Sequence, residues 1–126
     1  MPSDTLKSVA SQLVENCRTG NEEKGLKELY AEDAVSVEAA DVDGSGRQVS
    51  GLDGIRGKHA WWDEHFEVHS SNVDGPYLHG DDQFSVVFEV DATDKARGAR
   101  FQMKEVAVYT LNAAGKIARE AFFMRT

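Results

Sequence analysis

The stretch that decides the fold of this chain is 101–126, FQMKEVAVYTLNAAGKIAREAFFMRT. Side chains of different character alternate through 101–111 and again through 116–126, as they do in β-strands that present two different faces. Asn-Ala-Ala-Gly at 112–115 stands between the two segments and favours a turn. The stretch therefore predicts a β-hairpin.

The expected register of this hairpin brings two glutamates together. If Asn112 lies opposite Gly115, then Glu105 lies opposite Phe122. Glu120 is then the diagonal neighbour of Glu105, at about 7–8 Å between backbones. Two carboxylates so close in an apolar cavity do not both ionise easily, so one pKa is expected to rise into the range used for acid–base catalysis. The alternative is that both are structural groups, satisfied by an arginine or a buried hydroxyl.

The part of the chain before the hairpin predicts three helices and further strands. Apolar residues recur at helical spacing from 6 to 17, between Ser3 as N-cap and Gly20 as terminator. A second, shorter helix follows Asn21, and a third covers about 52–66. The other expected elements are a strand over 34–39, a polar loop over 40–50 and an alternating strand over 84–91. Helices first and strands afterwards predict an α+β fold with the helices on one face of the sheet.

Composition narrows the classes of partner. The chain has 126 residues, with 22 acidic and 14 basic side chains and a net charge of −8, so one domain over 1–126 is expected. Nucleic acids and anionic membranes would be repelled by this charge. Cys17 is the single cysteine, which fits a reducing compartment, and there is no apolar run long enough for a signal peptide or a membrane span. We therefore expect a cytoplasmic protein.

Several short motifs carry a resemblance to a known family. They are YAEDAV at 30–35, VAVYT at 106–110, GKI at 115–117 and FF at 122–123. In this order they resemble the SnoaL-like family of the nuclear transport factor 2-like superfamily, and the middle of the chain is similar to one bacterial subgroup. The resemblance implies a cone in which three N-terminal helices pack on a strongly bent, mostly antiparallel sheet that encloses a pocket. The family mixes isomerases, cyclases, dehydratases and non-catalytic binders, so the fold does not choose a function.

The resemblance also adds a third acidic candidate. Glu38 stands where the ketosteroid isomerase branch has its general-base aspartate. The oxyanion-binding positions of that branch fall on Leu13 or Val14 and on Ala107, which cannot donate a hydrogen bond from the side chain. Without those donors the main stabilisation of the enolate in that branch is missing, so steroid isomerisation by that mechanism is not expected. In the cyclase branch, the acid position of the last strand corresponds here to Phe122.

The catalytic candidates are therefore Glu105, Glu120 and Glu38. We expect a set of apolar and polar-tipped side chains to line the pocket beside them. This ligand-binding set is Trp62, His65, His69, Phe88, Met103, Tyr109 and Phe122. The two histidines could equally be surface or satisfied core residues.

No metal or cofactor is predicted. The four histidines match no metal-binding spacing. The loop that begins DVDGSG at 41 lacks the glutamate that would complete a calcium site, because Leu52 occupies that position.

Apolar residues on the outer face of the hairpin predict an interface with another protein chain. Its apolar residues are Val106, Val108, Ala121 and Phe123. Because the helices are expected on the opposite face, this strip is expected to join two copies in a homodimer.

Two functions remain open at this point. The first is a cofactor-independent enzyme of the isomerase, cyclase or dehydratase type, which moves protons on a small apolar or carbonyl-bearing molecule. The second is a non-catalytic small-molecule binder or dimeric accessory protein whose glutamates are structural.

Overall fold

The computed structural model describes residues 3–41 and 44–124. These residues form three helices and six strands, with two helices first and most of the strands after the third helix, as expected of an α+β fold. They are α1 (Asp4–Thr19), α2 (Glu22–Leu29), β1 (Tyr30–Val37), β2 (Gln48–Ser50), α3 (Gly51–His65), β3 (Phe66–His79), β4 (Gln83–Asp94), β5 (Ala99–Leu111) and β6 (Ile117–Met124).

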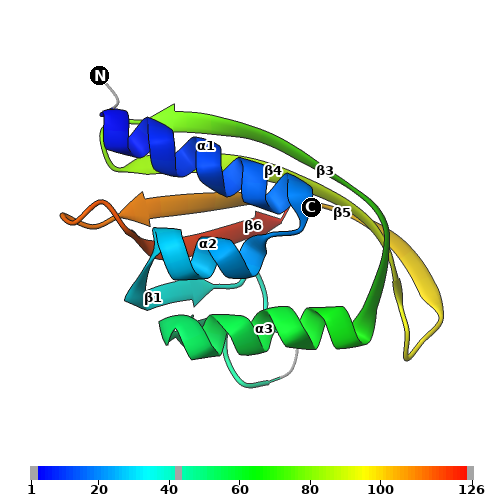
Figure 1. Ribbon diagram of the computed structural model, residues 1–126. Helices are drawn as coiled ribbons and strands as arrows, with labels where there is room; N and C mark the ends of the chain where they lie inside the picture. Colours follow the sequence, from blue (N-terminus) through cyan, green and yellow to red (C-terminus); the bar gives the residue numbers. More distant parts are fainter. Residues whose placement is uncertain (1–2, 42–43, 125–126) are drawn as a thin grey trace.

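The strands form one sheet in the order β2-β1-β6-β5-β4-β3. β1 runs parallel to β6, and every other neighbouring pair is antiparallel. Figure 1 shows the three helices on one side of the sheet, with the long strands β3, β4 and β5 curving around from the α1 end toward α3. The expected cone of helices on a bent, mostly antiparallel sheet is confirmed.

Local sequence explains where the first helix begins and ends. The hydroxyl of Ser3 accepts a hydrogen bond from the Leu6 amide at 3.1 Å, and Gly20 ends the helix with a φ of 73°, a left-handed conformation that favours glycine. The apolar face of α1 packs against β3 and β4. Cys17 belongs to this face and packs against the main core.

The main core lies between α1 and the middle of the sheet. Its centre is the stacked pair of Phe84 and Tyr109, whose rings are 4.8 Å apart and whose residues are 1% and 3% exposed. The two residues face one another across β4 and β5. The surrounding buried residues include Leu6, Ala10, Leu13, Val14, Val86, Ala107 and Ile117.

Some boundaries differ from the sequence-based expectation. The third helix agrees to within one residue, but β1 begins at Tyr30, and Gln48–Ser50 forms a strand inside the segment predicted as a loop. β2 has only three residues, and it exists through its pairing with β1 rather than through a propensity of its own. Residues 42–43 of the expected loop and 125–126 of the expected last strand lie outside the described residues.

The predicted hairpin register is wrong by two residues. Glu105 pairs with Met124 rather than with Phe122, and Glu120 pairs with Tyr109. The connection is longer than the expected turn because the Asn112 side chain accepts hydrogen bonds from the amides of Ala114 and Lys116, both at 3.0 Å. An irregularity follows Thr110 in the ladder.

The shift has two consequences for the predicted faces. Because it is an even number of residues, each side chain keeps its predicted face. Glu105 and Glu120, however, are not diagonal neighbours.

Within the described residues, no helix has the length and apolar character needed to cross a membrane.

The stacked aromatic pair generates a stability prediction. Phe84→Ala should lower the free energy of unfolding by about 3–5 kcal/mol, because it leaves a cavity beside Tyr109. Val68→Ala, at a position that is 44% exposed on β3, should change it by less than about 0.5 kcal/mol. Urea unfolding followed by circular dichroism measures both, and equal losses in the two variants would contradict this account of the core.

Candidate functional site

Two of the three candidate glutamates, Glu38 and Glu120, lie within 4 Å of one ammonium group, that of Lys58 on α3. Lys58 Nζ forms an ion pair with Glu38, and Glu120 Oε2 lies 3.9 Å away. The third carboxyl, Glu105, belongs to the same face of the sheet and is the diagonal neighbour of Phe122, whose ring lies beneath the ammonium. Ser36 Oγ accepts a hydrogen bond from Nζ at 2.6 Å. We call Lys58, Ser36 and the three glutamates the lysine-centred site.

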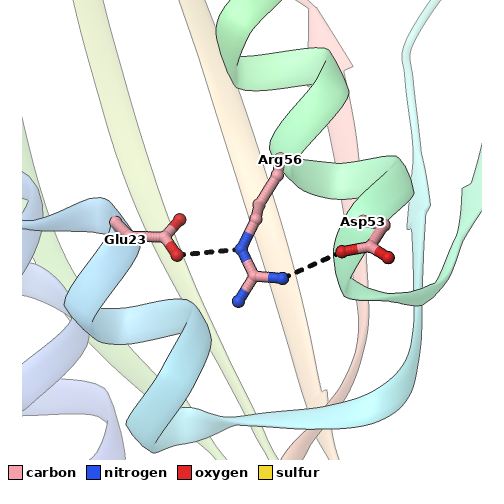
Figure 2. A network of polar contacts seen from close by, with 3 residues as sticks. All are labelled: Glu23, Asp53 and Arg56. Carbon is pink, nitrogen blue, oxygen red and sulfur yellow. Dashed lines mark hydrogen bonds and ion pairs between the residues drawn. The ribbon is translucent and has the colours of Figure 1, made fainter.

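Helix α3 is held in place by a second set of charges, on its other side. Arg56 Nε donates to Glu23 of α2 at 2.8 Å, and Arg56 Nη1 donates to Asp53 at 3.1 Å (Figure 2). These groups are substantially exposed, so their energetic contribution is small. They nevertheless join α2 to α3.

Glu38 stands directly after β1, where the chain leaves the sheet. Its backbone amide donates to the carbonyl of Arg47 at 2.7 Å, and its own carbonyl accepts from Arg47 Nε at 2.9 Å. These two bonds close the base of the loop between β1 and β2. The carboxylate is thereby held beside Lys58, with about a third of its side chain exposed.

Glu120 is the buried member of the site. It is 2% exposed and lies between Ser36 on β1 and Tyr109 on β5, its partners in the two ladders. Burial first, and then the charge of Glu120, raise the pKa of Tyr109 well above its usual value. The same two causes raise the pKa of Tyr30, whose hydroxyl also approaches this carboxylate. Oε1 of Glu120 has no hydrogen bond of good geometry to any described residue.

Glu105 differs from the other two glutamates. It lies on β5 opposite Phe88 and is half-buried. Its carboxyl makes no hydrogen bond or ion pair with the residues of 3–41 and 44–124. Loss of hydration on burial, followed by the charge of Glu38, raises the pKa of Glu105 to about 7 from an ordinary value of 4.5. A carboxyl with this pKa exchanges protons readily near neutral pH.

Four of the predicted ligand-binding residues share the face that carries Glu105 and Glu120. Phe122 carries the Lys58 ammonium over its ring at 4.2 Å from the centroid. Phe88 packs against the main core, and Met103 is half-buried two residues before Glu105. Tyr109 fills the core rather than open space.

The other three predicted ligand-binding residues lie elsewhere or only at the edge. Trp62 stands one helical turn after Lys58 on α3 and stacks on Phe66 at 4.3 Å between ring centroids. His65 Nδ1 lies 2.7 Å from the carbonyl of Trp61, on whose ring it stacks. His69 is exposed on β3 and bonds the Thr93 hydroxyl at 2.7 Å. The structure therefore does not bring the two histidines to the glutamates, because the last turn of α3 and the edge strand turn them toward local partners.

Two hollows of the described surface lie away from the glutamates. One is lined by three residues from each of β3, β4 and β5, and the other lies beside the turn between β5 and β6. The first is lined by Ser70, Ser71, Asn72, Glu89, Val90, Asp91, Gln102, Met103 and Lys104. The lysine-centred site is instead partly open, with 20% of the Lys58 side chain exposed. An enclosed pocket around it stays a prediction.

Among residues 3–41 and 44–124, no group of three or more histidine, cysteine or acidic side chains is placed to hold a metal ion.

Sequence reasoning missed Lys58 and Ser36. Lys58 lies three residues after Ile55 and four before Trp62, so it shares their face of α3. A lysine on the apolar face of a helix needs an acidic partner when it is buried, so the sequence alone could have predicted one.

Comparison with known proteins settles the family. The family model of the SnoaL-like domain matches residues 5–124. This chain belongs to the SnoaL-like family. A similar solved structure, from Mesorhizobium loti, shares 37% identity with a TM-score of 0.85 and covers 93% of this chain and 97% of its own. It is provisionally named a SnoaL-like polyketide cyclase. Among curated proteins, none matches this chain.

More distant structures share the fold. A protein from Bacillus subtilis, provisionally named an isomerase, is 17% identical with a TM-score of 0.68, covering 97% of this chain and 84% of its own. A protein from Mycobacterium tuberculosis, solved with estradiol-17β-hemisuccinate, is 17% identical with a TM-score of 0.66, covering 93% and 92%. These two likenesses concern the fold of the SnoaL-like domain alone.

The raised pKa of Glu105 predicts how stability depends on pH. The folded state holds the proton up to about pH 7, whereas the unfolded state loses it near 4.5, so the contribution of Glu105 to stability falls as the pH rises between these values. Glu105→Gln removes this titration. Relative to wild type, the variant should gain roughly 1–3 kcal/mol between pH 4.5 and pH 8. Urea unfolding at pH 4.5, 6 and 8 measures the gain.

The control for this experiment is Glu64→Gln, at an exposed position on α3. Its difference from wild type should stay small at every pH. A Glu105→Gln protein that is markedly less stable than wild type at pH 8 would mean that Glu105 has a structural partner in the folded state.

Proposed function

We propose that this SnoaL-like domain is a cofactor-independent enzyme that moves a proton on a small carbonyl-bearing molecule, in a reaction of the isomerase, cyclase or dehydratase type. Glu105 is the general acid and base. The observation that carries this proposal is a half-buried carboxyl with no partner among the described residues and a pKa of about 7. A structural carboxylate in this place would be expected to have a hydrogen-bonded partner, because burying an unpaired charge costs several kcal/mol.

The other two glutamates have supporting roles in this proposal. Glu38 and Glu120 both raise the pKa of Glu105 by their charge, and Lys58 lowers it. The pKa of about 7 is thus the result of opposing charges as well as of burial. This balance suits one group that first accepts a proton from a carbon acid and then returns it.

The test is exchange of carbon-bound hydrogen for deuterium. A panel of small ketones, such as cyclohexanone and 2-cyclohexenone, is incubated with the protein in D₂O, and loss of the α-proton signal is followed by NMR. Wild type should accelerate exchange over buffer of the same pD, with a rate that rises through the pKa of Glu105. Glu105→Gln should lower the acceleration by about 10²–10⁴-fold, whereas Glu64→Gln should leave it unchanged. No acceleration of any ketone by the wild-type protein would count against the enzyme.

A second candidate function is non-catalytic binding of a small molecule. The ion pair between Glu38 and Lys58 and the burial of Tyr109 in the core favour it, because part of the predicted pocket is already filled and paired. The Mycobacterium tuberculosis protein carries a steroid ester on the same fold. Saturable binding of estradiol-17β-hemisuccinate or of a ketone, with no proton exchange, would support this candidate instead.

We further propose that the protein is a cytoplasmic homodimer that joins through the outer face of the sheet. Figure 1 shows the helices on the other face. Phe123 is 57% exposed, and Val106 and Val108, on the neighbouring strand, keep part of their surface exposed. Val106 pairs with Phe123 and Val108 with Ala121, so the four residues form one continuous apolar strip.

Val108→Lys tests this interface. A lysine in the middle of the strip would place two charges near the axis of a two-fold dimer, so the variant should be monomeric. Val68→Lys, on the edge strand β3, is the matched control and should leave the association unchanged. Size-exclusion chromatography with light scattering measures both. Wild-type protein that is already monomeric at micromolar concentration would rule out the dimer.

A further inference from the structure

The hydrogen bonds of Lys58 leave one of its donors uncommitted. An ammonium group carries three N–H donors. One donates to Glu38 and one to Ser36 Oγ at 2.6 Å. Glu120 Oε2, at 3.9 Å, is beyond hydrogen-bond distance and contributes its charge only. The third N–H therefore has no acceptor among residues 3–41 and 44–124 and remains available to one from a bound molecule.

The position of this ammonium is nevertheless fixed. Glu38 is anchored by the two backbone bonds to Arg47, and Ser36 lies within β1. The ring of Phe122 supports the ammonium at 4.2 Å. A charged donor held by such contacts needs little reorganisation free energy when a negative charge develops beside it. This preorganisation is what makes electrostatic stabilisation of a transition state effective.

The free N–H of Lys58 and the carboxyl of Glu105 belong to one site. The Phe122 ring that supports the Lys58 ammonium lies diagonally across β5 and β6 from Glu105, on the same face of the sheet. With 20% of its side chain exposed, Lys58 is reachable from solvent, and Glu105 is half-buried. A carbonyl compound needs this combination: a donor for its oxygen and a base for the hydrogen on the adjacent carbon.

We propose that Lys58 is the catalytic electrophile of the site. This role rests on the proposed function. The free N–H of Lys58 donates to the carbonyl oxygen of the substrate while Glu105 removes the α-proton. The electron pair of the broken C–H bond forms the carbon–carbon double bond of an enolate, and the carbonyl π electrons move to the oxygen, where Lys58 stabilises the charge. Glu105 then returns its proton to carbon, so no oxidant or other reactant is consumed. Glu38 and Ser36 are positioning residues that act through Lys58.

The charge of the site also defines the substrate class. Two carboxyl groups lie within 4 Å of one cation and a third, Glu105, is on the same face of the sheet, in a chain whose net charge is −8. A substrate that carries a phosphate or a carboxylate close to its reacting carbonyl would be repelled. The substrate is therefore a ketone or related carbonyl compound that is neutral near its reacting centre.

The first test uses the ketone exchange assay. Lys58→Met keeps an unbranched side chain that is one heavy atom shorter, and it removes the charge. It should lower the exchange rate constant by about 10²–10³-fold, mainly in kcat, because the lost interaction strengthens in the transition state. Lys104→Met is the matched control and should exchange like wild type, since Lys104 pairs with Glu89 at 3.3 Å and its side chain is on the opposite face of β5 from Glu105. Glu38→Gln should give a smaller loss of kcat with KM unchanged, as expected of a positioning residue.

The second test does not depend on turnover. 4-Nitrophenol resembles an enolate once ionised, and its phenolate absorbs visible light. Titration of the dye with wild-type protein at several pH values gives separate affinities for the phenol and the phenolate. Lys58→Met should weaken phenolate binding at least tenfold relative to phenol binding, whereas Lys104→Met should not.

The two tests separate this inference from the proposed function. Exchange that is lost in Glu105→Gln but kept in Lys58→Met, with no change in phenolate affinity, would overturn the role of Lys58 and leave Glu105 as the base. Phenolate binding that depends on Lys58 in a protein that exchanges no ketone would overturn the enzyme and keep Lys58 as an oxyanion-binding group. Wild type that neither exchanges ketones nor binds phenolate would overturn both.

A folding control completes the design. If Lys58→Met fails to fold because Glu120 loses the cation beside it, Lys58→Met with Glu120→Gln removes the buried charge as well. The same loss of phenolate affinity, measured against Glu120→Gln alone, is then expected of the double variant.

Discussion

The buried carboxylate of Glu120 needs a cation, and much of the site follows from that need. Moving an ionised carboxylate out of water costs several kcal/mol unless an opposite charge compensates. Lys58 is the cation within 4 Å, and it comes from α3, whereas Glu120 belongs to the middle of β6. The requirement therefore ties the helix to the parallel pair of β1 and β6. It also brings Glu38, at the exit of β1, into the same cluster.

The sequence predicted the faces of the sheet better than the contacts between strands. Alternation places Glu105, Glu120 and Phe122 on one face, and an even shift in register does not change that. The register itself was wrong because the Asn112 side chain organises a longer connection than its sequence suggests. Such a choice depends on hydrogen bonds within the turn, which alternation does not reveal.

The candidate site was predicted in part. The three glutamates were named from the sequence, and the structure brings them together, although through a lysine that sequence reasoning had not considered. His65 and His69 were expected beside them and instead bond the Trp61 carbonyl and the Thr93 hydroxyl. Membership of the SnoaL-like family gives the cone and says little about the chemistry. The chemistry depends on which charges lack partners, and that requires the side-chain contacts.

The same burial that shapes the acidic site also controls the single thiol of the chain. Cys17 packs against the core beneath α1, and burial, followed by the charges of Glu22 and Glu120, raises its pKa to about 12. A thiol that stays protonated is a poor nucleophile, so Cys17 reacts slowly with oxidants and alkylating reagents in the folded protein. The thiol becomes reactive only when α1 separates from the sheet. The rate at which Cys17 is labelled in the native protein therefore reports how often that helix opens.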